Sequence, residues 1–323
     1  MTEPLLEVEG LSVRFDTDEG TVHAVDRMSL TLAPGQVLGI VGESGCGKSV
    51  TAMSILRLLP QTATVTGSAR FEGRELLEAP GSQLRRIRGR EISFVFQEPM
   101  TSLNPVLRVG HQIGEVLREH LDLSRQAARA RTIELLDLVH IPDPERRADE
   151  YPHQLSGGMR QRVMIAMALA CDPKILIADE PTTALDVTIQ AGILDLLREL
   201  RGRLGTAIVL ITHNLGVVAD IADRVVVMYA GRKVEEAPVE ELFAHPQHPY
   251  TIGLLGAIPR PGHAHNGRLR EIPGRVPSLA ELPGHCAFAD RCPRADELSW
   301  SEVPQLREVR PDHTVACFHP GER

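Results

Sequence analysis

The sequence has few aromatic residues, few cysteines and no long apolar run. Phe, Trp and Tyr together make up 3% of its 323 residues, and there is one tryptophan. No apolar run approaches the about 18 residues that a membrane-spanning helix needs, so we expect no such helix. The first ten residues, MTEPLLEVEG, are acidic where a signal peptide would be basic. These features favour a soluble cytosolic protein.

The chain also lacks an excess of positive charge. Its 35 Lys and Arg residues face 43 Asp and Glu residues, and the net charge of −8 argues against general nucleic-acid binding. The five cysteines of a cytosolic chain are not expected to form disulfides. Hydrophobic residues, by contrast, reach 42%, which is enough for a sizeable core. The length predicts roughly two domains.

Apolar patterns along the chain alternate between strands and helices. Residues 5–15 and 22–32 predict strands near the N-terminus, and 224–236 predict a hairpin that turns at Ala230-Gly231. Buried strands are predicted at Val37–Val41, 91–97, 174–179 and 207–214, and helices at 49–59, 156–170 and 188–204. Alternation of this kind predicts an α/β fold with a mainly parallel sheet. After Pro238 the composition shifts to Pro, His and Gly, so we predict domains at 1–240 and 241–323, with a helical part at about 100–165.

A glycine-rich segment follows the strand that ends at Val41. GESGCGKS fits the phosphate-loop pattern G-x-x-x-x-G-K-S, and it lies between a buried strand and a helix, as that motif requires. Its N–H groups and the helix N-terminus can bind phosphates, Lys48 can reach the β- and γ-phosphates, and Ser49 can bind Mg²⁺. The predicted nucleotide contacts are Gly42, Glu43, Ser44, Gly45, Cys46, Gly47, Lys48, Ser49 and Val50. Because N–H dipoles favour a thiolate, we predict that thiol reagents attack Cys46 and block nucleotide binding.

Polar residues follow the ends of three other predicted strands. Asp179 and Glu180 end the apolar run KILIADE, and they are suited to holding Mg²⁺ and polarising the attacking water, respectively. Gln97 and His213 end two further strands. Because parallel strands direct their carboxyl ends to one ligand crevice, we expect these side chains to meet beside the phosphate loop. The catalytic set predicted in this way is Glu180, His213 and Gln97, with Mg²⁺ bound by Ser49, Gln97 and Asp179.

The segment LSGGMRQR, at 155–162, resembles the signature motif of ATP-binding cassette (ABC) ATPases. The order of motifs also matches that family over residues 5–243: phosphate loop, Gln97, signature, ILIADE, TALD and His213. The resemblance implies a P-loop NTPase with a RecA-like mixed sheet core, an N-terminal antiparallel β subdomain, a helical signature subdomain and a small C-terminal extension. It further implies hydrolysis of ATP with Mg²⁺.

In the resembled family two cassettes enclose two ATP molecules. This implies that Ser156, Gly157, Gly158 and Met159 contact the ATP of a second subunit, homologous or identical, and that Asp186 communicates across the dimer. His213 would hold the γ-phosphate. Phe15 would stack on adenine or, as the alternative, pack in a strand core. Met159 departs from the glutamine that is usual in the wider family, and peptide-importer cassettes often have methionine there.

Two further segments resemble cassettes that drive dipeptide and oligopeptide import, at 96–115 and 245–261. The implied partners are two membrane permease subunits, bound at the cytoplasmic face of the membrane, and indirectly an extracytoplasmic peptide-binding protein. Pro99 to about Glu119 is the predicted permease surface. Nickel, glutathione or cell-wall peptide remain alternative cargoes, and an ABC ATPase not tied to transport remains an alternative function.

The C-terminal region contains a C-x5-C pair, Cys286 and Cys292, followed far downstream by Cys317. Similar regions of peptide-importer cassettes have four cysteines, which implies an iron–sulfur cluster. Here the third position is Ser299, although such clusters prefer thiolates. Zinc bound by the three cysteines with His285, His313 or His319 is the second interpretation. Simple packing of the cysteines is the third.

Overall fold

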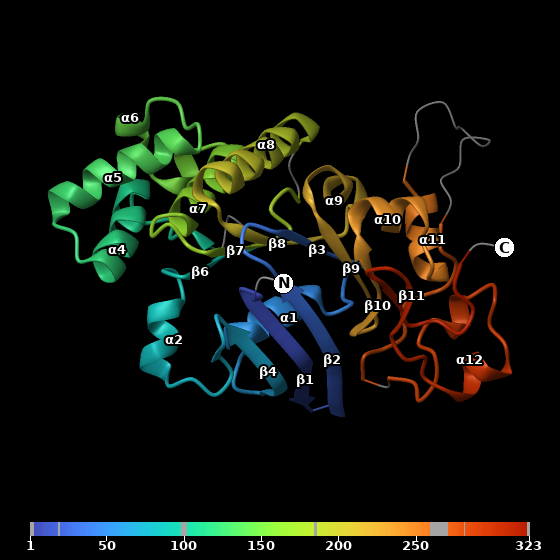
Figure 1. Ribbon diagram of the computed structural model, residues 1–323. Helices are drawn as coiled ribbons and strands as arrows, with labels where there is room; N and C mark the ends of the chain where they lie inside the picture. Colours follow the sequence, from blue (N-terminus) through green and yellow to red (C-terminus); the bar gives the residue numbers. More distant parts are fainter. Residues whose placement is uncertain are drawn as a thin grey trace. The chain divides into compact units, whose positions relative to one another are not determined.

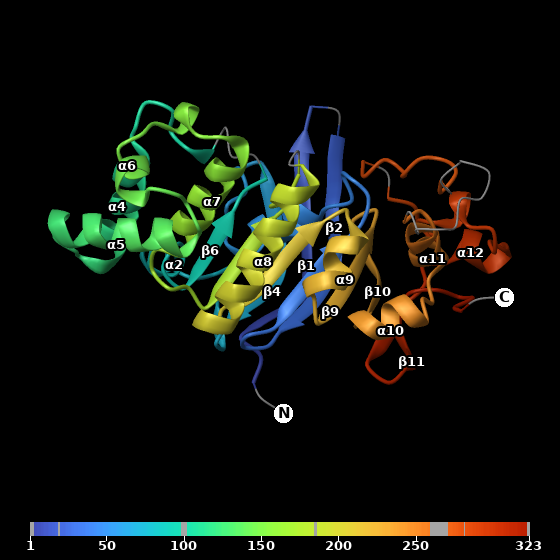
Figure 2. The ribbon, with the colours of Figure 1, turned by 90° about the horizontal axis from the view of Figure 1, so that it is seen from above.

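The computed structural model describes residues 3–18, 20–97, 102–183, 186–258, 271–280 and 282–321 (Figures 1 and 2). The chain forms two compact units. The first contains residues 1–33, 37–78 and 211–323, and the second contains residues 34–36 and 79–210. The C-terminal residues therefore cluster with the N-terminal strands. The predicted domain boundary near residue 240 stays a prediction.

The first unit contains a four-stranded sheet in the order β2-β1-β4-β5. Its strands are β1 (Leu6–Thr17), β2 (Gly20–Leu32), β4 (Ala63–Phe71) and β5 (Arg74–Glu75), and all their pairings are antiparallel (blue in Figure 1). Leu6, Val8, Leu11 and Val13 are buried, and the register shifts between Val8 and Leu11. The predicted antiparallel N-terminal strands are confirmed, with an irregularity where the alternation slips.

Further strands of the first unit run in the order β11-β12-β10-β9-β3. They are β11 (Arg307–Arg310), β12 (His313–Val315), β10 (Arg232–Pro238), β9 (Arg224–Tyr229) and β3 (Val37–Val41). Every residue of β3 is buried, and β3 is parallel to β9. The predicted hairpin turns at Ala230 and Gly231, which both have positive φ. β12 was not predicted from the sequence; its Thr314 and Val315 pair with β10.

Helices of the first unit flank these strands. They are α1 (Lys48–Ile55), α9 (Leu215–Ile221), α10 (Val239–Ala244), α11 (Pro249–Gly256) and α12 (Glu297–Ser301), with a 3-10 turn η2 at Ala289–Arg291. Buried Glu235 of β10 accepts hydrogen bonds from the backbone N–H groups of Gln247 (2.7 Å) and His248 (2.9 Å). His313 of β12 also bonds Glu235, at 2.7 Å. These contacts fix α11 and β12 to the sheet.

The second unit combines parallel strands with the helices between residues 79 and 210 (teal through green to yellow in Figure 2). Strands β6 (Ile92–Val95) and β7 (Ile175–Asp179) pair in parallel. β8 (Ala207–Thr212) follows, and its residues 207–210 belong to this unit. The helices are α2 (Gly81–Ile87), α4 (Val109–Leu121), α5 (Arg125–Leu138), α6 (Pro144–Ala148), η1 (Pro152–Gln154), α7 (Gly157–Ala168) and α8 (Val187–Leu204). The apolar stripe predicted for the last helix is buried at Ile193, Leu196, Leu197 and Leu200. No helix in the described ranges has the length and apolar character needed to cross a membrane.

Candidate active site

The loop between β3 and α1 has a shape that requires glycine at two positions. Gly42 has φ 155° and Gly47 has φ 99°. A Cβ atom on Gly42 would lie 2.3 Å from the carbonyl oxygen of Met228, and one on Gly47 would lie 2.3 Å from that of Ala24. Ser44 and Gly45, at the tip of the loop, are exposed. The backbone therefore forms a tight turn that leads directly into a helix N-terminus, an arrangement that binds phosphate.

Lys48 is the first residue of α1, and its side chain folds back into the loop. Its Nζ donates hydrogen bonds to the carbonyl oxygens of Gly42 (2.8 Å) and Glu43 (3.0 Å), and the residue is 5% exposed. The ammonium group is thus held at the centre of the turn. This is the position from which a lysine can neutralise the phosphates of a bound nucleotide.

Cys46 lies in the same loop, but its thiol is not set up as we predicted. The side chain is fully buried, and burial raises the pKa of Cys46 above 9, against the smaller opposing effect of Lys48. A buried thiol of raised pKa reacts slowly. The prediction of a thiolate open to reagents is therefore wrong, because desolvation outweighs the N–H dipoles.

Gln97 and Glu180 come together in the second unit. The Nε2 of Gln97 donates a hydrogen bond of 3.2 Å to Oε2 of Glu180, and the hydroxyl of Thr183 donates one of 2.7 Å to the same oxygen. Glu180 is 8% exposed and has φ 46°, in the left-handed region. Such backbone strain costs about 1 to 3 kcal/mol and is concentrated at functional sites. Thr183 was not predicted as a site residue, although it stands only three residues beyond Glu180.

The signature segment starts a helix, as predicted. Ser156 is the N-cap of α7, and its Oγ accepts a hydrogen bond of 3.3 Å from the N–H of Met159. Ser156 and Gly157 are exposed. A Cβ on Gly158 would lie 2.7 Å from Cγ2 of Ile189 in α8. Asp186 caps α8, since its Oδ1 accepts a hydrogen bond of 2.9 Å from the N–H of Ile189. The starts of α7 and α8 thus lie together, and Ser156, Gly157 and Asp186 are exposed there.

The remaining predicted residues are divided between the units. Asp179 is 4% exposed at the end of β7, next to Glu180. Ser49, half-buried Phe15 and exposed His213 belong to the first unit. Phe15 lies on β1 opposite Val22 and is only half-buried, and its stacking on adenine stays a prediction. The meeting of Gln97, Glu180, His213 and Lys48 at one crevice stays a prediction.

Comparison with known proteins decides the family. Residues 25–183 match the family described as "ABC transporter". A probable peptide ABC transporter ATP-binding protein of Sinorhizobium fredii is 54% identical over 98% of this chain and 96% of its own length. The chain belongs to the ABC transporter ATP-binding family. A Brucella abortus protein with a provisional name as a peptide import ATP-binding protein is 52% identical over 98% of this chain and 97% of its own length.

Solved structures show the same fold. An ATP-binding cassette solved as a dimer in a post-hydrolysis state, bound to ADP and Pi, has a TM-score of 0.66 at 29% identity, covering 72% of this chain and 98% of its own. A cassette from Clostridium perfringens, part of an ABC transporter complex, has a TM-score of 0.63 at 30% identity, covering 75% and 92%. The predicted P-loop NTPase fold is confirmed. The ABC cassette therefore binds ATP, and its glycine turn and Lys48 fit the phosphates.

The C-terminal region of this cassette matches a second family, "Oligopeptide/dipeptide transporter, C-terminal region", at residues 234–298. Its cysteines are free and half-buried. Burial raises the pKa of Cys286, Cys292 and Cys317 above 9, for Cys317 to about 11. In the described part of the chain, no three His, Cys, Asp or Glu side chains are placed to hold a metal ion.

The three histidines named for zinc, and Ser299 at the expected third cysteine position, have other partners. Ser299 donates to Asp296 at 2.7 Å, and His319 lies 2.8 Å from the same carboxyl group. His313 pairs with buried Glu235, and the ring of His285 packs against Trp300 with 5.4 Å between centroids. The described residues therefore do not fit the iron–sulfur cluster or zinc site that we predicted.

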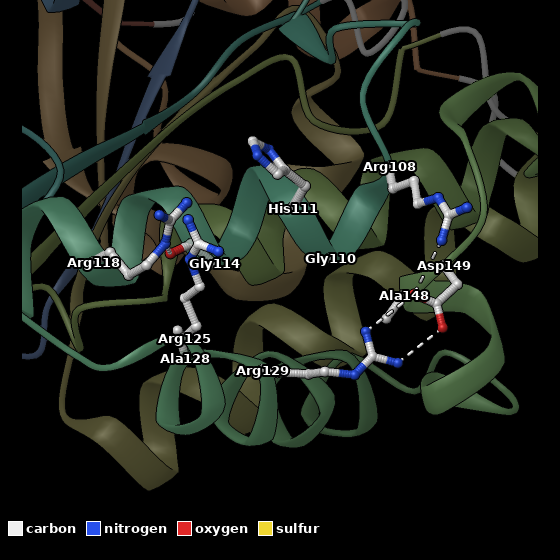
Figure 3. Close-up of a pocket in the computed structure, with 10 residues that line it drawn as sticks. All are labelled: Arg108, Gly110, His111, Gly114, Arg118, Arg125, Ala128, Arg129, Ala148 and Asp149. Carbon is white, nitrogen blue, oxygen red and sulfur yellow. Dashed lines mark hydrogen bonds and ion pairs between the residues drawn. The ribbon is translucent and has the colours of Figure 1, made fainter.

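A basic pocket lies within the helices of the second unit (Figure 3). Its volume is about 390 Å³, and Arg108, Arg118, Arg125 and Arg129 line it with His111. Asp149 pairs with Arg129 at 2.8 Å and with Arg108 at 3.7 Å. Arg118 and Arg125 lie together away from that carboxylate. Arg108 and His111 fall within the predicted permease surface, of which residues 99–101 lie outside the described residues.

Proposed function

We propose that this cassette hydrolyses ATP to power the import of peptides across the cytoplasmic membrane. The observation that carries the proposal is the joint presence of two features in one chain. One is the ATP-binding cassette with its phosphate loop and the exposed start of its signature helix. The other is the C-terminal region matched by the oligopeptide/dipeptide transporter family. The relatives at 54% and 52% identity have names that refer to peptide transport or import.

The chemistry follows from the side chains described above. Lys48 and the loop N–H groups bind and neutralise the phosphates, which is the main catalytic contribution in phosphoryl transfer. Glu180, oriented by Gln97 and Thr183, polarises the water that attacks the γ-phosphate. Ser49, Gln97 and Asp179 would hold Mg²⁺, which would supply positive charge beside the phosphate oxygens. His213 contacts the γ-phosphate, and Phe15 stacks on the adenine.

Hydrolysis in this proposal requires a second cassette, identical or homologous. The exposed Ser156 and Gly157 bind the γ-phosphate held by the other subunit, and Asp186 communicates across the dimer. Closing and reopening of the dimer then move two permease subunits, which receive peptide from an extracytoplasmic binding protein. The chain acts at the cytoplasmic face of the membrane. The permease contact lies on α4 and the basic pocket beside it.

Uptake of labelled cargo by cells lacking this chain tests the proposal. We expect loss of dipeptide or oligopeptide uptake, restored by the wild-type chain but not by Glu180→Gln. Normal peptide uptake, with loss of nickel, glutathione or cell-wall peptide uptake instead, would keep the transport ATPase and change its cargo. Normal uptake of all of them would contradict a role in transport.

A further inference from the structure

Three groups of Glu43, the second residue of the phosphate loop, each form hydrogen bonds with a different residue: its backbone N–H, its carbonyl oxygen and its carboxylate. Its backbone N–H donates to the hydroxyl of Tyr250 at 2.8 Å, and its carbonyl oxygen accepts from Lys48 at 3.0 Å. Its carboxylate accepts two hydrogen bonds from Arg291, with Nη1 at 2.7 Å and Nη2 at 3.0 Å. Two of these three partners belong to the C-terminal region, and all of these residues lie in the first unit.

Arg291 is built into its position. Its side chain is 3% exposed. Nε donates to the carbonyl oxygen of Pro273 at 2.9 Å, and Nη2 donates to that of Ile272 at 3.1 Å. The guanidinium carbon lies 5.7 Å from the ring centre of Tyr229 and 5.9 Å from that of Phe288. The hydrogen bonds to Glu43 raise the pKa of Arg291 above its ordinary value. Bidentate geometry of this kind is strong and directional.

The cysteine segment presents this arginine. Arg291 ends the 3-10 turn η2, between Cys286 and Cys292. The backbone of the segment closes on itself, because Ala289 N–H donates to Cys286 O at 3.0 Å and Cys292 N–H donates to Ala289 O at 3.1 Å. In the described structure, the C-x5-C segment thus forms a compact turn that directs Arg291 to the phosphate loop.

The charges of Glu43 and Arg291 affect the binding of ATP. Glu43 places a carboxylate in a loop that binds a triphosphate, and an uncompensated negative charge there opposes binding. Arg291 supplies the compensating charge. Meanwhile Tyr250 takes the Glu43 N–H, which fixes the turn that directs the Gly42 and Glu43 carbonyl oxygens at Lys48.

We propose that Arg291 and Tyr250 are positioning residues of the ATPase: the C-terminal region holds Glu43, neutralises its charge and so sets the affinity of the phosphate loop for ATP. The inference rests on the proposed ATPase function. It gives the C-terminal region a role in the nucleotide site of its own chain, separate from any role in cargo or in metal binding.

A double-mutant cycle, measured on ATP hydrolysis by the assembled transporter, distinguishes the loss of charge neutralisation from a general disturbance of the fold. Arg291→Gln leaves Glu43 charged, and we expect the KM for ATP to rise by about tenfold, the size of one lost charged hydrogen bond, with a smaller change in kcat. Glu43→Gln combined with Arg291→Gln removes both charges, and we expect much of the lost affinity to return. Tyr250→Phe should raise KM without altering the charges. Arg310→Gln breaks an exposed ion pair with Glu241 in the same region and should have the wild-type KM.

The outcomes distinguish this inference from the proposed function. A wild-type transporter that hydrolyses no ATP would contradict the proposed function itself. An active wild type whose KM is unchanged by both Arg291→Gln and Tyr250→Phe would overturn the inference alone. A double variant as weak in ATP binding as Arg291→Gln would also overturn it, because neutralisation would then play no part. If Arg291→Gln does not fold, two other comparisons of KM still test the inference. One compares Tyr250→Phe with the wild type, and the other compares the double variant with Glu43→Gln.

Discussion

Oε2 of Glu180 accepts a hydrogen bond of 3.2 Å from Gln97 and one of 2.7 Å from Thr183. Both partners donate, so they hold this carboxylate oxygen in a fixed position beside the end of β7. We expect Glu180→Gln to keep ATP binding and to lower turnover by about a hundredfold or more, since general-base contributions are typically of that size. ATP binding and steady-state hydrolysis, measured on the same preparation, check this.

Glu134→Gln provides a matched control, because Glu134 is exposed on α5 and pairs only on the surface with Arg131. It should hydrolyse ATP at the wild-type rate. Near-normal turnover in Glu180→Gln would remove Glu180 from its proposed role.

Cys46 should be a slow thiol. Its full burial and raised pKa predict that a thiol reagent labels it far more slowly in the folded protein than in denaturant. Mass spectrometry of labelled peptides gives the rate at each cysteine. Rapid labelling of Cys46 that ATP prevents would show that the loop opens and that burial does not control this thiol.

His248 should make stability fall in mild acid. The pKa of His248 is lowered from 6.5 to about 4, chiefly because the side chain is buried; the nearby Glu235 acts in the opposite direction. The unfolded chain therefore binds the proton first as pH falls below 6.5. Stability is fully present above that pH and is lost as pH falls to about 4, by on the order of 3 kcal/mol.

His248→Asn is the variant for this test, because asparagine can still accept the hydrogen bond that His248 takes from the N–H of Tyr250. We expect urea denaturation to show a smaller loss of stability between about pH 7 and about pH 5 in the variant. An equal loss in both proteins would mean that another group causes it.

The basic pocket should contribute to the permease contact. Arg118→Gln with Arg125→Gln removes the two arginines that lie away from Asp149 (Figure 3). We expect weaker association with the permease subunits, by roughly tenfold for two charges, and unchanged ATP binding. Arg198→Gln with Arg203→Gln, on α8, removes the same charge from surface ion pairs. Pull-down of the permease subunits at several salt concentrations compares the two double variants with the wild type. If the pocket variant binds the permease subunits as strongly as the α8 variant does, the contact lies elsewhere.

Local patterns predicted the fold well where one stretch of sequence specifies one element. Val37–Val41 is apolar and buried throughout, and the signature begins a helix at Ser156, because strand burial and helix capping are short-range effects. The pair Arg291–Glu43 was not predicted, since it joins residues 248 positions apart. Similarly, three residues of β12 carry no periodicity. His313 was one of three histidines named as zinc ligands, but it pairs with Glu235. Ser299, which stands at the expected third cysteine position, donates to Asp296.

Peptide uptake by the reconstituted transporter tests the central claim most directly. Membrane vesicles would contain the two permease subunits and this cassette with its partner, supplied with ATP and with the binding protein carrying labelled peptide. The account predicts uptake that needs ATP and stops with Glu180→Gln, although that variant still binds ATP. Uptake that continues without ATP, or continues at the wild-type rate with Glu180→Gln in every cassette, would contradict it.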